Sequence, residues 1–263
     1  MPDEKQIYQL IEEYNKGTRA EFAARWKVWP IDLENPGPSE VTIGLLHRQY
    51  RLAANIVSNP GIWSHDIAPI ILRSMVEVFI WLSWILADPA ERSMKFIDDG
   101  LGKEKLAIKH RTEEIEAMQM DPSEDFTLKV SKAWVESHRY SYLIDVNLSG
   151  SWSGLDTRKM AEEAGCRDFY RFTYPMFSST VHSTWNHIGK FDLMPCRNPL
   201  HAGHRIPNDD AMPLSSGFPF LAAKYLDETF NLVDEHLKIS TEVESTFERL
   251  FIETEDETLG TEA

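Results

Sequence analysis

The chain has 263 residues, of which 42% are hydrophobic and 26% are charged. This length and composition suffice to bury a full core, so the fold needs no disulfide framework or structural metal. Its 42 acidic residues outnumber its 27 basic residues, which gives a net charge of -15. This balance argues against a broad nucleic-acid-binding face, because Lys and Arg supply phosphate affinity. The net charge of the whole chain does not exclude a local basic pocket.

Most of the negative charge lies at the two ends of the sequence. Residues 240–263 carry a net charge of -7 and residues 1–13 a net charge of -3, which leaves the body of the chain nearly balanced. A run of acidic residues is usually solvated. We therefore expect a single helical domain over residues 1–239 and an acidic, flexible C-terminal tail over residues 240–263.

Apolar residues recur at helical spacing in the first third of the chain, which predicts helices over about 3–28, 39–58 and 64–87. Residues 67–87 are long and apolar enough to span a bilayer. However, Arg73 and Glu77 fall near the middle of this segment, where charge is expensive in lipid. We interpret the segment as a buried core helix and expect no membrane interaction.

Helix signals continue through the middle of the chain. Asp88 and Pro89 start a helix that Gly100 and Gly102 are expected to break. A further helix follows Asp121. Its expected inner face carries Phe126, Val130, Ala133, Trp134 and Tyr140.

Asp156 is expected to cap a short helix that Gly165 ends. The next helical run extends over about 167–189, and Pro175 must kink it or restart it. Residues 192–214 read as a long loop, and a last helix follows over about 216–239. The predicted fold class is all-α, an antiparallel helical bundle with extra helices and a long loop near residues 192–214.

Two groups of polar residues interrupt these apolar helices. Arg73 and Glu77 are four residues apart and can pair on one helix face. This pair could be a core salt bridge that fixes helix register, or it could contact an anion or phosphate. Tyr170, Tyr174, Ser178 and His182 form a second ladder with a period of four. A serine four residues before a histidine can hydrogen-bond to it, which favours a catalytic role for Ser178 and His182.

The order and spacing of Arg73-x3-Glu77, the segment KMAEEAG and Tyr174-x3-Ser178-x3-His182 resemble the bacterial family called domain of unknown function 5677. The resemblance covers about residues 45–190. It implies an all-helical domain in which the Arg/Glu helix faces the Tyr/Ser/His helix. The family brings no established activity.

A looser similarity is to the HEPN helical-bundle ribonucleases, in which a histidine follows an arginine by four to six residues. The comparable string here runs from Arg197 to His204, but Pro199 and Gly203 indicate a loop in place of a helix. Arg73 and His182 on two facing helices could serve the same chemistry, with the histidine as general acid or base.

Metal and cofactor signals are weak. His182, His187, His201 and His204 form a histidine-rich set, but a stable zinc site needs three or four ligands and no known ligand signature supplies them. We expect no metal and no cofactor. The two cysteines, Cys166 and Cys196, have no paired spacing, and the N-terminus lacks a secretion signal, which together favour a cytoplasmic location.

Two functions remain open from the sequence. The first is a metal-independent ribonuclease or nucleotide-acting enzyme in which Arg73, Glu77, Ser178 and His182 are catalytic and Tyr170 and Tyr174 bind substrate. Its partner would be RNA or an anionic small molecule, and a homodimer is possible. The second is a non-catalytic helical interaction or scaffold protein whose polar cluster is structural.

Overall fold

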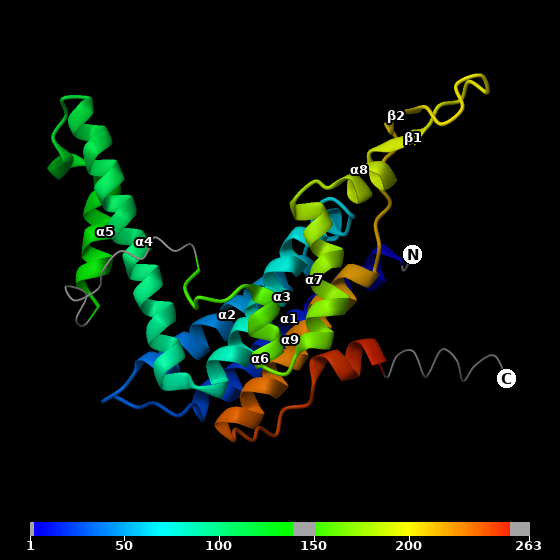
Figure 1. Cartoon of the computed structure of the whole chain (residues 1–263). Helices are drawn as coiled ribbons and strands as arrows, with labels where there is room; N and C mark the ends of the chain where they lie inside the picture. Colours follow the sequence, from blue (N-terminus) through cyan, green and yellow to red (C-terminus); the bar gives the residue numbers. More distant parts are fainter. Residues whose placement is uncertain (1–2, 139–150, 253–263) are drawn as a thin grey trace.

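The computed structural model describes residues 3–138 and 151–252, and helices dominate the described chain (Figure 1). This confirms the predicted all-α fold. The helices are α1 (Glu4–Lys27), α2 (Gly37–Val57), α3 (Ala68–Ala87), α4 (Pro89–Ala117), α5 (Phe126–Glu136), α6 (Thr157–Glu163), α7 (Arg167–Val181), α8 (Trp185–Phe191) and α9 (Gly217–Leu237).

Helix α3 forms the centre of the bundle. It contacts α2, α4, α6, α7 and α9, and its residues Leu72, Met75, Val76 and Ile80 are fully buried. Within the described chain it is the one helix that is long and apolar enough to cross a membrane, and 61% of its most apolar window is buried inside the bundle. The apolar composition of α3 is therefore accounted for by packing, because neighbouring helices cover most of its surface.

A buried glutamine joins the three central helices. Gln49 of α2 donates from Nε2 to the Thr229 hydroxyl of α9 at 3.1 Å and to the Met75 carbonyl of α3 at 3.2 Å. Thr229 in turn donates to the Tyr225 carbonyl at 2.6 Å. Since a buried amide is costly without partners, these hydrogen bonds fix the register of α2 against α3 and α9.

Helix α4 runs without a break through Gly100 and Gly102, so the predicted interruption is wrong. Glycine in a helix interior costs only about 1 kcal/mol relative to alanine. Packing of the neighbouring Leu101, which is 1% exposed, offsets that cost. The small Gly102 is buried as well, in a part of α4 that is covered by other residues.

The α4–α5 hairpin projects from the bundle as an arm (Figure 1). Helix α5 packs on α4 through Leu128 and Val135, which are 2% and 7% exposed. Phe126, Val130 and Trp134 lie on the opposite side and are largely exposed, so the predicted inner face is wrong. Helical spacing fits both faces of α5, and the projecting arm leaves only one of them covered. Tyr140, expected on the same face, lies outside the described residues.

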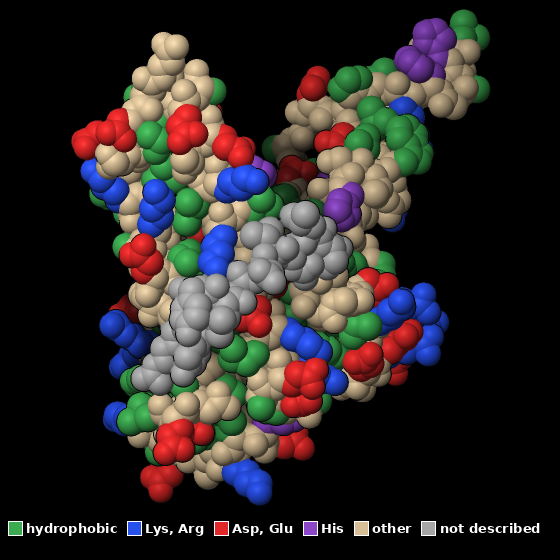
Figure 2. All heavy atoms as spheres, turned by 60° about the vertical axis from the view of Figure 1, so that its left-hand side comes forward, with side chains coloured by type: hydrophobic (Ala, Val, Ile, Leu, Met, Phe, Trp, Pro, Cys, Tyr) green, Lys and Arg blue, Asp and Glu red, His purple; other side chains and the backbone are tan. Residues whose placement is uncertain are grey.

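The expected loop at 192–214 contains a short β-hairpin. Strand β1 (Leu193–Pro195) pairs antiparallel with β2 (Arg205–Pro207), and Met194 lies opposite Ile206. The hairpin extends away from the bundle beyond α8 (Figure 1). Figure 2 shows histidine side chains at its far end.

The first half of the expected tail packs on the bundle. The Thr246 amide donates to Oε1 of Glu21 in α1 at 2.9 Å, and Thr246 is 2% exposed. In the π-helical turn Glu248–Ile252, the Phe251 ring lies 6.2 Å from that of Tyr14. Residues 253–263 lie outside the described residues, so the flexibility expected of them stays a prediction.

Candidate functional site

Arg73 and Glu77 pair on α3, as their spacing predicts. Nη1 of Arg73 lies 2.8 Å from Oε1 of Glu77, and their side chains are 8% and 29% exposed. Burial lowers the pKa of Arg73, and the Glu77 carboxylate opposes this change by stabilising the cation. The pair is therefore a nearly buried guanidinium beside a carboxylate that still reaches solvent.

Tyr174 of α7 covers this pair. Cζ of Arg73 lies 3.1 Å from the centroid of the Tyr174 ring, and the Tyr170 ring lies 4.6 Å from the Tyr174 ring. Nε of Arg73 is buried and has no hydrogen-bond partner among the described residues. The Arg/Glu helix and the Tyr helix thus face each other, and Arg73, Glu77, Tyr170 and Tyr174 form one cluster that largely shields Arg73 from water.

Ser178 and His182 lie farther along the chain. A helix rises 1.5 Å per residue, which separates the Cα atoms of Tyr174 and His182 by about 12 Å. His182 is the C-cap of α7 and is exposed, and Ser178 is half-buried. Over residues 3–138 and 151–252, neither side chain makes a hydrogen bond to Arg73 or Glu77. The roles assigned to these residues stay predictions.

A tight turn after His182 reverses the chain into α8. The Ser183 amide donates to the Thr180 carbonyl at 3.2 Å, and the Thr184 amide donates to the Ser179 carbonyl at 3.1 Å. This pair of hydrogen bonds is a Schellman motif, which requires a left-handed residue and usually takes glycine there. Ser183 occupies that position with φ 47°. The turn brings α8 back against the end of α7.

The turn sets His187 of α8 between Thr180 and Asp66. Nδ1 of His187 lies 3.1 Å from the Thr180 hydroxyl, and Nε2 lies 3.9 Å from Oδ1 of Asp66 in the segment before α3. His187 is 7% exposed. The neighbouring His65 stacks on Phe191 at 4.4 Å, and burial together with His187 lowers the pKa of His65. His187 thus has a hydrogen-bond partner at Nδ1, and the carboxylate near Nε2 lies beyond hydrogen-bond distance.

This trio opens onto a cavity of about 450 Å³. Asp66, Thr180, Ser183, His187 and Asp192 supply its polar walls, with Ile70 among the apolar ones. An imidazole at hydrogen-bond distance from a hydroxyl can activate it by taking its proton. A carboxylate orients such a ring when it comes within hydrogen-bond distance of the other nitrogen, and Asp66 is 3.9 Å away in this structure. None of the catalytic or substrate-binding residues predicted from the sequence lines this cavity in the described chain.

Sequence reasoning missed this trio for a structural reason. His187 appeared only as one of four scattered histidines, and Asp66 and Thr180 carried no motif. The three residues meet because the chain reverses at Ser183, and serine gives little indication of a left-handed turn.

The histidines at 201 and 204 lie elsewhere, in the β1–β2 hairpin. Their ring nitrogens and the Cys196 sulfur lie within 4.8 Å of one another. Among the cysteine, histidine and acidic side chains of the described residues, these three lie close enough together to hold a metal ion. Cys196 is not among the candidate metal-binding residues predicted from the sequence.

A comparison with known protein families covers both groups of residues described on the helices. A family model described as a family of unknown function (DUF5677) matches residues 39–195, which includes Arg73, Glu77, Tyr174, Ser178 and His182. The matched segment also holds Asp66, Thr180 and His187. No curated protein and no solved structure matches the chain. The family match spans more than half of the sequence, and the chain belongs to the DUF5677 family of unknown function.

Proposed function

We propose that the chain is a metal-independent acyl-transfer or hydrolytic enzyme whose reactive centre is Thr180, His187 and Asp66. The supporting observation is the approach of the Thr180 hydroxyl to Nδ1 of His187 at 3.1 Å on the wall of an open cavity. A nucleophile within hydrogen-bond reach of a base that a third group orients is the signature of nucleophilic catalysis. This centre replaces the pocket of Arg73, Glu77, Ser178 and His182 as the proposed site of chemistry.

The reaction assigns one role to each residue. With its proton on Nε2 facing Asp66, His187 accepts the Thr180 proton at Nδ1. The Thr180 oxygen then bonds to the carbonyl carbon of the substrate, the bond to the leaving group breaks, and His187 returns the proton to that group. In the second half, His187 takes a proton from water, and the water oxygen bonds to the acyl carbon. The bond between this carbon and the Thr180 oxygen then breaks, the carboxylic acid leaves, and His187 returns the proton to the Thr180 oxygen.

The charges at the cavity favour an uncharged substrate. Asp66 and Asp192 line it, and none of its described lining residues is Lys or Arg. Two carboxylates repel a phosphate, whereas they leave a neutral ester or amide carbonyl unaffected. The proposed substrate class is therefore a neutral acyl compound, and RNA is the competing substrate.

The experiment uses p-nitrophenyl acetate, a small neutral ester, with the full chain. We expect a burst of nitrophenolate and an acetyl group on Thr180, located by mass spectrometry of peptides. Thr180→Val and His187→Ala should each lower the acetylation rate at least 100-fold. Ser179→Ala is the matched control, because Ser179 neighbours Thr180 but donates to the Met176 carbonyl at 2.9 Å.

Two results would overturn the proposal. One is acetylation of the parent at positions other than 180, with equal rates in the Thr180→Val protein. The other is RNA cleavage that needs Arg73 and His182 but is unchanged in His187→Ala, which would favour the ribonuclease hypothesis.

A non-catalytic role is the second candidate, and the burial of Arg73 favours it. An arginine held between Glu77 and the Tyr174 ring resembles a group that fixes helix packing. If Thr180→Val and His187→Ala react with the ester as the parent does, and RNA also stays intact, this second candidate is the better account.

A further inference from the structure

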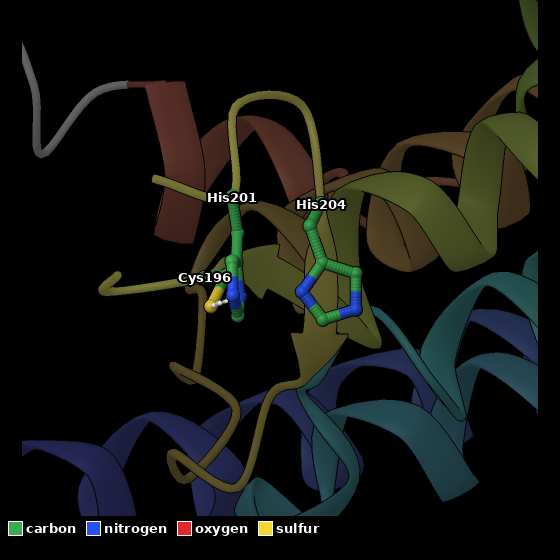
Figure 3. Close-up of side chains that lie close together, drawn as sticks. All are labelled: Cys196, His201 and His204. Atoms are coloured by element: carbon green, nitrogen blue, oxygen red, sulfur yellow. Dashed lines mark hydrogen bonds between the residues drawn. The ribbon is translucent and has the colours of Figure 1, made fainter. Parts of the chain in front are cut away.

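The β1–β2 hairpin gathers three metal-binding side chains at its open end. Cys196 follows β1 and His204 precedes β2, and the Cys196 amide donates to the His204 carbonyl at 3.0 Å. Between them the loop turns back on itself, with the His204 amide donating to the His201 carbonyl at 3.0 Å and Gly203 at φ 76°. All three side chains therefore point into one small space (Figure 3).

One distance within this group equals that of a tetrahedral zinc site. Sγ of Cys196 lies 3.6 Å from Nδ1 of His201, and one donor atom from each of the three residues lies within 4.8 Å of the others. With Zn–S and Zn–N bonds of ordinary length, the sulfur and nitrogen of a tetrahedral site are about 3.6 Å apart. The Cys196–His201 edge thus already has the length that the metal requires.

We propose that Cys196, His201 and His204 bind one Zn²⁺ ion, with water in the fourth position. A thiolate with two imidazoles suits zinc, whereas magnesium and calcium select oxygen ligands. His204 and His201 are exposed and Cys196 is half-buried, so the ion can enter from solvent. Binding releases the thiol proton and leaves each imidazole neutral.

Asn198 supports the same site from outside. Its side-chain amide lies 3.2 Å from Nε2 of His201. When Nδ1 binds the metal, Nε2 carries the proton, so a half-turn of the Asn198 amide is needed to set its oxygen on that N–H. This half-turn exchanges the hydrogen bond that the oxygen now accepts from the Leu200 amide at 3.0 Å for one from His201. A hydrogen bond of this kind orients a metal-ligating histidine, and its loss typically weakens metal binding about 10- to 100-fold.

The ion would also stabilise the hairpin itself. The β1–β2 ladder has only three residues in each strand, and it extends from the bundle beyond α8 (Figure 1). A metal that joins both strands constrains their separation, since it binds the folded hairpin and not the open chain. Zinc should therefore protect residues 193–207 against proteolysis. The family match ends at residue 195, so this site lies outside the segment that defines the family.

The experiment titrates the reduced, chelator-treated full chain with Co²⁺ as a spectroscopic substitute and then with Zn²⁺. We expect one equivalent of Co²⁺ to produce thiolate-to-cobalt charge transfer and tetrahedral visible bands, and Zn²⁺ to displace both. Cys196→Ser should remove the charge-transfer band. His201→Ala and His204→Ala should each weaken Zn²⁺ binding at least 10-fold in competition with a chromophoric chelator.

Matched controls test whether the site is specific. Cys166→Ser removes the other cysteine, and His110→Ala removes an exposed histidine of α4, so both proteins should bind like the parent. The proposal is overturned if the parent gives no thiolate band, or if Cys196→Ser binds Zn²⁺ as tightly as the parent. Acetylation of Thr180 plays no part in this readout, so the two proposals stand or fall separately.

Discussion

The Arg73 guanidinium lies over the Tyr174 ring, with 3.1 Å between the Arg73 Cζ atom and the ring centroid. The ring replaces much of the water that an arginine would otherwise keep, and a partly desolvated cation over an aromatic face gains about 2 kcal/mol. The contact with the Tyr174 ring and the ion pair with Glu77 together explain how an arginine can occupy the most apolar helix of the chain.

The ring of Tyr174, more than its hydroxyl, should account for this stabilisation. We expect Tyr174→Ala to lower the free energy of unfolding by about 1 to 3 kcal/mol, because it removes the ring contact and part of the packing between α3 and α7. Tyr174→Phe should differ from the parent by less than about 0.5 kcal/mol. Urea denaturation measures both variants. Equal midpoints for Tyr174→Ala and the parent would contradict this account.

The left-handed turn at Ser183 predicts a stabilising substitution. A non-glycine residue in this conformation costs about 1 kcal/mol, so Ser183→Gly should raise the free energy of unfolding by a similar amount. Ser137 is the matched control. It caps α5 with φ -68°, so glycine there should give no gain. Thermal unfolding compares the two variants, and a lower melting temperature for Ser183→Gly would show that the turn is not strained.

Close packing between α1 and the C-terminal segment makes Gly17 sensitive to added volume. A Cβ atom at this position would come within 3.1 Å of the Thr246 Cβ and closer still to its hydroxyl and methyl groups. We expect Gly17→Ala to cost about 1 to 3 kcal/mol of stability. Gly100→Ala in α4, where the added Cβ meets no atom within 4 Å apart from its chain neighbours and its own helix backbone, should instead stabilise by about 0.5 to 1 kcal/mol. Denaturation midpoints that moved alike in both variants would refute the packing argument.

Buried and half-buried carboxyl groups on α1 and α9 predict lower stability at higher pH. Burial raises the pKa of Glu21 and Glu228 above the ordinary value of 4.5, and it raises that of Asp234 above 3.8 despite the opposing Arg25. The folded state therefore holds these protons to higher pH than the unfolded state. Their contribution to stability is present below the unfolded pKa values and is lost as pH rises through the folded ones.

Glu21→Gln tests the sign of this effect. The amide oxygen can still accept from the Thr246 amide, but it carries no proton to lose. Between about pH 5 and about pH 8, urea unfolding of this variant should show a smaller loss of stability than the parent. Glu113→Gln, on the exposed side of α4, should retain the parental dependence. A steeper loss in Glu21→Gln would refute the assignment.

The two faces of α5 should respond differently to truncation. Leu128 is 2% exposed and Phe126 is 78% exposed. Leu128→Ala should cost about 2 to 4 kcal/mol, because it opens a cavity between α5 and α4. Phe126→Ala should change the free energy of unfolding by less than about 0.5 kcal/mol. Hydrogen exchange of the α4–α5 amides measures the local effect, and equal protection in the two variants would contradict the observed orientation.

Local signals in the sequence were enough to predict most helices. Asp156 accepts from the Lys159 amide at 2.8 Å, and Gly165 adopts φ 73° after the same helix, which confirms the predicted start and end of α6. Pro89 lies in the first turn of α4, where its missing N–H costs nothing. Such signals act within a few residues, so the sequence alone reveals them.

Features that depend on tertiary contacts were predicted less well. The break at Gly100 was wrong because the packing of Leu101 outweighs a weak helix preference. The spacing of Arg73 and Glu77 predicted their pairing correctly, since it needs only one helix. The contact between Thr180 and His187 needs the turn at Ser183, and the metal-binding group needs the hairpin. Neither can be read from spacing along a chain.

The contact between Glu21 and Thr246 joins residues 225 positions apart. During synthesis, α1 leaves the ribosome long before its partner exists, and Tyr14 lacks the Phe251 ring until residue 251 has been added. Contacts of such long sequence separation form slowly, because chain entropy must be lost before they stabilise anything. Helix α1 is therefore fully covered only after the last described turn, Glu248–Ile252, has been synthesised. A ribosome that stalls before residue 246 would hold a bundle whose first helix is still incompletely covered.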